Sequence, residues 1–124
     1  MVKRIIITET ADIRKAVAGV LEDARSSVLL TVEKEFDIKL SLNELLSNSI
    51  KYSDCSHTVM EYDLSDDCFC CRIMDNGKGF CVEEIGCAEL YGESGRGVYL
   101  VRSVTEELIY NKEGNSVFFR IRLR

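Results

Sequence analysis

Apolar residues recur along the chain with two periods, and the changes between them mark the predicted elements. Residues 2–9 are rich in Ile and Thr and predict a strand. A helix follows, with Thr10 as its expected N-terminal cap and Asp12 in the first turn, where the helix dipole favours an acid. Its apolar stripe has helical spacing and consists of Ile13, Ala16, Val17, Val20, Leu21 and Ala24. Residues 25–35 are mixed and indicate a turn that could include a short helix.

A second helix, predicted over residues 37–52, has two stripes. The stripe expected to face the core consists of Ile38, Leu42, Leu45, Leu46 and Ser49. Polar residues follow one another in steps of four, three, four and three, which places them on another side: Asp37, Ser41, Glu44, Asn48 and Lys51. An ordinary solvated helix face has the same pattern, so the polar stripe alone does not establish a site.

The second half of the chain predicts a hairpin, a helix and a second hairpin. After a polar turn at 53–56, the segments 57–64 and 68–74 alternate and read as strands joined at 65–67. The segment 81–91 is ambiguous. The helix after residues 92–97 is expected to turn these side chains inward: Val98, Val101, Val104 and Leu108.

A hairpin turn at 113–115 leads to the last strand, which directs two sets of side chains to opposite faces. The inward set is Val117, Phe119, Ile121 and Leu123, and the solvated set is Arg120, Arg122 and Arg124. The element order is strand, helix, helix, strand, strand, helix, strand, strand. It predicts an α+β fold, a two-layer sandwich in which a mixed, mostly antiparallel sheet has its helices on one face.

Composition excludes several classes of protein. A chain of 124 residues with 46% hydrophobic residues fits one globular domain. A net charge of −5 argues against a nucleic-acid module. No apolar run approaches the ~20 residues of a membrane helix, and the first residues do not resemble a signal peptide. We therefore expect a cytoplasmic protein whose six cysteines are reduced thiols.

The cysteines include one pair with metal-ligand spacing, Cys68 and Cys71, followed by Cys81 and Cys87. A zinc site requires four converging ligands. If 68–74 is a strand, Cys68 and Cys71 point to opposite faces. Packing of small apolar side chains is therefore favoured over zinc and over disulfides, which both stay open.

The polar helix stripe is the first of three segments with residue types suited to a ligand. Glu44, Asn48 and Lys51 present a carboxylate, an amide and an ammonium group on one face. These groups can serve as a base, a metal ligand and a phosphate contact.

The other two segments contain glycines. In 75–79 (DNGKG), Asp75 continues the inward phase of its strand, where a carboxylate needs a partner such as the exocyclic amine of a ligand. In 95–97 (GRG), the glycines precede a predicted helix, whose free N–H groups and dipole suit a phosphate. Taken singly, these segments also fit a plain turn and a flexible helix start.

Together, the three segments resemble the GHKL ATPase superfamily, which has the Bergerat ATP-binding fold. Residues 44–52 (ELLSNSIKY) resemble the N-box, 75–80 (DNGKGF) the first glycine box and 95–101 (GRGVYLV) the second. Order and spacing match over nearly the whole chain. The likeness is strongest to the anti-sigma factor serine-protein kinases, which share the opening strand and helix and an Asp-Ile pair before the N-box, here at 37–38. It implies a single histidine-kinase-like ATP-binding domain over residues 1–124.

The resemblance also implies residue roles, with ATP and Mg²⁺ as cofactors. Asn48 would ligate Mg²⁺, Glu44 would be the general base that takes the proton of a protein serine, and Lys51 could reach a phosphate. In the second glycine box, the residues facing the phosphates would be Gly95, Arg96 and Gly97.

The adenine contact is implied for the first glycine box. Asp75 would hydrogen-bond the adenine amine, and Gly77 and Gly79 would let the loop pass close to the nucleotide. Ser116 stands where the family often has a threonine that supports the contact between the aspartate and adenine.

The function implied is a serine/threonine-protein kinase that is also an anti-sigma factor. It would phosphorylate an anti-anti-sigma (STAS-type) protein and sequester a sigma factor, with ATP or ADP biasing the choice of partner. It would act as a homodimer, without direct contact with nucleic acid or membrane.

Two alternatives stay open. The segment 80–94 is short for an ATP lid, which favours a non-catalytic ATP-binding interaction module. Lys51 and Tyr52 are more typical of sensor histidine kinases, which favours a stand-alone ATP-binding domain of that type. Those kinases carry a helix pair with a phosphorylated His, for which the chain leaves no room, and His57 is expected to be a surface residue.

Overall fold

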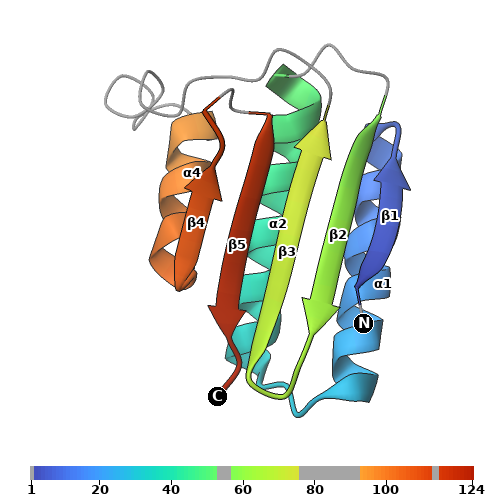
Figure 1. Cartoon of the computed structure of the whole chain (residues 1–124), viewed down its shortest axis with the longest axis vertical. Coiled ribbons are helices and arrows are strands. Elements are labelled where there is room, and N and C mark those ends of the chain that lie inside the picture. The colour runs from blue at the N-terminus through green and yellow to red at the C-terminus, as the bar shows by residue number, and fades with distance from the viewer. Residues whose placement is uncertain (1, 53–56, 76–92, 113–114) are drawn as a thin grey trace.

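A five-stranded sheet lies in front of three helices in the computed structural model, which describes residues 2–52, 57–75, 93–112 and 115–124 (Figure 1). The strands are β1 (Lys3–Ile7), β2 (Thr58–Leu64), β3 (Cys68–Asp75), β4 (Glu107–Tyr110) and β5 (Ser116–Arg122). Their spatial order is β1-β2-β3-β5-β4, and each neighbouring pair is antiparallel. The helices are α1 (Thr10–Ser27), α2 (Val32–Tyr52) and α4 (Glu93–Val104). The predicted α+β sandwich with helices on one sheet face is confirmed.

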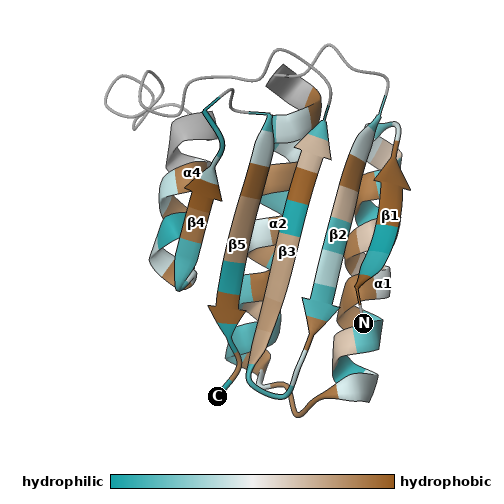
Figure 2. Cartoon of the chain, in the orientation of Figure 1, coloured by the Kyte–Doolittle hydropathy of each residue, from teal (hydrophilic) through white to brown (hydrophobic). Residues whose placement is uncertain are grey.

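The core lies between the helices and one face of the sheet. The apolar stripe predicted for the first helix is buried in full in α1. The stripe of α2 that was expected to face the core is buried as well. Brown and teal residues alternate along the helices in Figure 2. Strand residues that share the core face are buried, among them Phe69, Ile73 and Phe119. The helices therefore hold the sheet through one continuous apolar layer.

The opposite face of the sheet is partly solvated, as the arginine pattern of the last strand predicts. Arg120 forms an ion pair with Glu107 at 2.6 Å, and the guanidinium of Arg72 lies 5.7 Å from the ring centre of Phe118. Within the described residues, no helix has the length and apolar character that a membrane span requires.

The cap of α1 differs from the prediction. Glu9 is the N-terminal cap, and Thr10 is already the first helical residue. Asp12 provides the capping contacts, because its carboxylate accepts the backbone N–H groups of Thr8 and Glu9 at 3.1 and 3.2 Å. Its pKa is held below the ordinary value, mainly by the Thr8 contacts.

Helix α2 is longer than predicted, because it begins at Val32 and not near residue 37. Thr31 accounts for the earlier start: its hydroxyl oxygen accepts the N–H of Lys34 at 3.1 Å, and its carbonyl accepts the N–H of Glu35 at 2.9 Å. A threonine is a favoured cap at this position. Residues 25–35 are therefore the end of α1, a short connection and the start of α2.

Helix α4 starts earlier and ends earlier than predicted. Gly95, Arg96 and Gly97 lie inside the helix, not before it, and Leu108 belongs to strand β4. Burial of Val98 and Val101 stabilises the helix against the unfavourable helix propensity of its glycines. The predicted turn at 53–56, the ambiguous segment 81–91 and the middle of the hairpin turn, 113–114, lie outside the described residues.

Candidate functional site

The three segments singled out from the sequence meet at one end of the sheet. The last residues of α2 and β3 lie at this end, together with the first residues of α4 and β5 (Figure 1). Helix α2 packs directly against α4 and against β3. The fold therefore brings residues from distant parts of the sequence into one region.

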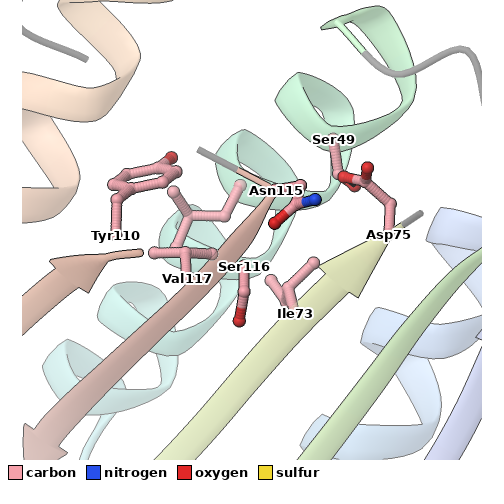
Figure 3. A pocket seen from close by; sticks show the side chains of 8 residues that line it. Ser49, Ile73, Asp75, Tyr110, Asn115, Ser116 and Val117 are labelled. Atoms are coloured by element: carbon pink, nitrogen blue, oxygen red, sulfur yellow. Dashed lines mark hydrogen bonds between the residues drawn. The ribbon is translucent and has the colours of Figure 1, made fainter. Parts of the chain in front are cut away.

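Asp75 is fixed by contacts with three other elements. Its Oδ2 accepts the hydroxyl of Ser49 in α2 at 2.9 Å, and the two side chains point toward each other in Figure 3. The Ser49 oxygen lies 3.0 Å from the hydroxyl oxygen of Thr58, which stands opposite Asp75 in the β2–β3 register. The backbone N–H of Asp75 donates to the carbonyl of Asn115 at 2.9 Å. The inward phase predicted for this carboxylate is confirmed, and its partner is Ser49.

The direction of this hydrogen-bond chain follows from the donors available. The Ser49 hydroxyl has one proton, which it donates to the carboxylate of Asp75. The Thr58 hydroxyl must then donate to the Ser49 oxygen. Both hydroxyl residues are buried, Ser49 at 8% and Thr58 at 1% exposure, so water does not compete for these bonds. The chain holds the Asp75 carboxylate in one orientation.

A pocket lies beside Asp75, between α2 and the sheet (Figure 3). It is partly open, and the centres of water-sized spheres fit within about 10 Å³ of it, which is room for about one water molecule. Its lining residues are Leu45, Ser49, Ile73, Asp75, Tyr110, Asn115, Ser116 and Val117. Apolar walls with one fixed carboxylate suit a ring that carries a hydrogen-bond donor.

Tyr110 connects the pocket to Asn48. It lines the pocket from β4, and burial raises the pKa of its hydroxyl well above the ordinary value, while the charge of Arg102 and a side-chain hydrogen bond with Asn48 oppose part of the shift. Asn48 is only 4% exposed, and its Nδ2 has no hydrogen-bond partner among the described residues. A buried N–H donor without a partner is costly, so it marks a place where a hydrogen-bond acceptor of a ligand fits.

Glu44 precedes Asn48 by one helical turn, is half-buried and faces α4. A Cβ atom built on Gly97 would overlap its carboxylate oxygen Oε2 and would lie 2.9 Å from Cδ. The predicted polar stripe therefore contributes to the seam between α2 and α4.

The remainder of the stripe is also buried. Asp37 is 8% and Ser41 0% exposed, and burial raises the pKa of the Asp37 carboxyl above its ordinary value. The Ser41 hydroxyl has no hydrogen-bond partner in the described part of the chain. The interpretation of the stripe as an ordinary solvated helix face is wrong for these residues.

The family model of the histidine kinase-like ATPase domain matches residues 7–121. This chain belongs to the histidine kinase-like ATPase family. Among solved structures it is similar to the histidine kinase AdeS of Acinetobacter baumannii, with 18% sequence identity and a TM-score of 0.48. That match covers 98% of this chain, which spans 66% of the AdeS chain. No curated protein matches the sequence.

Within this ATPase family fold, the expected site residues fall into three groups. Glu44 and Asn48 line the face of α2 against α4, and Asp75 lines the pocket. Ser116 lines the same pocket. The hydroxyl that donates a hydrogen bond to Asp75 belongs to Ser49. Gly97 lies in α4 and faces Glu44. The backbones of Lys51, Gly95 and Arg96 belong to α2 and α4, whereas Gly77 and Gly79 lie outside the described residues.

Sequence reasoning missed three residues of this site: Ser49, Thr58 and Tyr110. Ser49 was grouped with the apolar stripe of its helix, although a serine among leucines is itself a signal, because a buried hydroxyl needs a partner. Thr58 and Tyr110 gave no such signal, since a Thr and a Tyr are ordinary residues in strands.

The described cysteines lie on both faces of β3. Cys71 is buried in the core, where desolvation raises the pKa of its thiol, whereas Cys68 and Cys70 are half-buried on the opposite face. Cys68 and Cys71 therefore do not point toward one metal ion, as the strand geometry predicts. Cys55, Cys81 and Cys87 lie outside the described residues. His57 is exposed, as expected, and lines a separate shallow pocket.

Proposed function

We propose that the chain binds ATP with Mg²⁺ and phosphorylates a serine of a partner protein. The adenine ring would enter the pocket beside Asp75. The fixed carboxylate is a hydrogen-bond acceptor, and the exocyclic amine of adenine is a donor. Leu45, Ile73 and Val117 supply apolar surface for the ring. The family match supports a nucleotide ligand, and the chain Thr58–Ser49–Asp75 supports adenine within that class.

Asn48 fits the role of a Mg²⁺ ligand. Its amide is buried, and the ligand that fills the site would decide whether the oxygen or the nitrogen of the group faces it. Amide oxygens are suitable ligands for Mg²⁺. When bound, Mg²⁺ would neutralise charge on the phosphates that are transferred.

Glu44 fits the role of general base. It lies on the same face of α2 as Asn48, so a serine hydroxyl that approaches the phosphates would meet its carboxylate. Phosphoryl transfer depends chiefly on positioning and charge neutralisation, and a base positioned for the attacking hydroxyl contributes about 10²–10⁴-fold. The position of Glu44 one helical turn before the buried amide of Asn48 is the observation that carries the proposal.

The partner proteins are proposed from the sequence resemblance. An anti-anti-sigma protein of the STAS type would carry the serine, and a sigma factor would be sequestered by a homodimer of this chain. Differential affinity for the ATP and ADP forms would select between the partners.

The test is transfer of labelled γ-phosphate to STAS-domain proteins encoded in the same genome. Wild type should form phosphoserine on one of them, and Glu44→Gln should lower the rate by at least about 10²-fold while ATP still binds. Glu33→Gln, an exposed acid of the same helix, is the matched control and should retain the wild-type rate. Equal rates for wild type and Glu44→Gln would exclude Glu44 as the base.

A second candidate is a stand-alone ATP-binding domain of the histidine kinase type. The match to the histidine kinase-like family and the Lys51-Tyr52 pair favour it. The two candidates differ in the product, because phosphohistidine is lost in acid and phosphoserine is retained. An acid-labile label on a partner protein would select the second candidate.

A further inference from the structure

Helices α2 and α4 meet in the site at Glu44 and Gly97. Gly97 is buried in α4, and a Cβ atom placed on it would overlap Oε2 of Glu44 and lie 2.9 Å from Cδ and 3.5 Å from Cγ. Gly19 in α1 shows the contrast, because a Cβ atom there would have nothing within 4 Å. The volume that any side chain at position 97 would need is occupied by the carboxylate of Glu44.

The group that excludes a side chain at position 97 is Glu44, as the direction of the Cα–Cβ bond there shows. From Gly97 a Cβ atom would point at α2, toward one carboxylate, and all three nearest atoms belong to Glu44. Glycine weakens a helix interior relative to alanine, so a contact that requires its small size accounts for its presence here. Val98 and Val101 are buried beside it and fix the rotation of α4, while Leu45 does the same for α2. Room for a side chain at position 97 would therefore come from movement of the Glu44 side chain.

We propose that Gly97 is a positioning residue for Glu44. Because Gly97 has no side chain, the carboxylate of Glu44 occupies the space next to it, and this fixes the direction of the carboxylate. We call the space beside Gly97 that the carboxylate occupies the seat. The consequence for catalysis rests on the proposed function, in which Glu44 is the base. The packing of Glu44 against Gly97 does not depend on that function. A methyl group at position 97 would push the carboxylate out of its place and leave the pocket beside Asp75 unchanged. Because the seat belongs to α4, a displacement of this helix along α2 would also redirect the base.

The structural half is tested by thermal unfolding of four variants. Gly19→Ala should raise the melting temperature slightly, since alanine favours the helix and the site is open. Gly97→Ala should raise it less than Gly19→Ala does, because the gain in helix propensity is offset by displacing the Glu44 carboxylate. In the Glu44→Ala background Gly97→Ala should raise the melting temperature as much as Gly19→Ala does. An equal effect of Gly97→Ala in both backgrounds would overturn the proposal, and so would failure of the double variant to fold.

The catalytic half is tested by separating ATP affinity from the rate of transfer. Gly97→Ala should lower the rate of serine phosphorylation at least about 10-fold while the Kd for ATP changes less than about 3-fold, because a displaced base acts on the transition state. In the Glu44→Asp background, the shorter acid leaves room for the methyl group, so Gly97→Ala should change the rate little. A loss of ATP affinity as large as the loss of rate would show that Gly97 serves the nucleotide. If Glu44→Gln retains the rate of phosphorylation, Glu44 is not the base. The melting temperatures of the four variants still show whether Gly97 positions the Glu44 side chain.

Discussion

The hydroxyl of Ser49 provides the sharpest test of how the pocket is built. Ser49→Ala removes the bond to the Asp75 carboxylate at 2.9 Å and the contact with the Thr58 hydroxyl at 3.0 Å. A hydrogen bond to a charged group contributes about 1.5–3 kcal/mol, and a buried hydroxyl left unpaired costs about 1–3 kcal/mol. Because Thr58 is 1% exposed, water cannot replace the lost partner. We expect the variant to lose about 2–3 kcal/mol of unfolding free energy.

Thermal unfolding and ATP titration measure the two consequences. With an unfolding entropy of about 2.1 cal/mol/K per residue, a domain of 124 residues loses about 4 °C of melting temperature per kcal/mol, so about 8–12 °C is expected. ATP affinity should fall about 10-fold, which corresponds to about 1.4 kcal/mol, because Asp75 is no longer held in one orientation. Ser47→Ala, on the exposed side of the same helix, is the matched control and should change neither quantity appreciably.

A double variant separates the stability effect from the binding effect. Ser49→Ala with Thr58→Val replaces both partners by apolar groups, so part of the stability should return, about 1 kcal/mol or more. ATP affinity should remain as low as in Ser49→Ala, because the carboxylate is still unsupported. The reasoning is refuted if Ser49→Ala is as stable as Ser47→Ala and binds ATP as wild type does.

Two further predictions concern Asn48 and the anchor of the first strand. Asn48→Ala should weaken ATP binding measured with Mg²⁺ at least about 10-fold and leave binding in EDTA nearly unchanged; equal losses in both titrations would contradict the metal role. Asp23 accepts Lys3 at 2.7 Å and Tyr62 at 2.9 Å, and its pKa is lowered, first by the Lys3 contact. Its stabilising contribution is therefore complete above the ordinary pKa of 3.8 and is lost as the pH falls through the lower folded value. Urea unfolding at pH 4.5 and 2.5 should show a smaller acid-induced loss in Asp23→Asn than in wild type; identical losses would exclude this contribution.

Periodicity carried the prediction of the fold because the stripes are regular. The six buried residues of α1 were all placed on one face from their spacing, and Asp75 was placed inward from the phase of β3. The order of elements and the antiparallel hairpins followed from the same patterns. In such segments each local preference agrees with the final packing.

The element ends and the polar partners could not be predicted in the same way. The first turn of α2 contains the exposed residues Val32 and Phe36, so its pattern does not resemble an amphipathic helix, and only the Thr31 cap marks its start. Ser41 and Asn48 have the polar character of a solvated face, yet both are buried in a helix that packs against α1, α4 and the sheet. Burial of a polar stripe depends on which helix packs on it, and this is a property of the tertiary structure.

The central claim, that an adenine nucleotide binds with its ring against Asp75, is tested most directly by calorimetric titration of ATP and GTP. Wild type should bind ATP and bind GTP at least about 10-fold more weakly, because guanine presents an acceptor where adenine has its amine. Asp75→Asn should lower the ATP affinity at least about 10-fold and largely remove the preference for ATP. No binding of ATP to wild type, or equal ATP affinities for wild type and Asp75→Asn, would contradict the account.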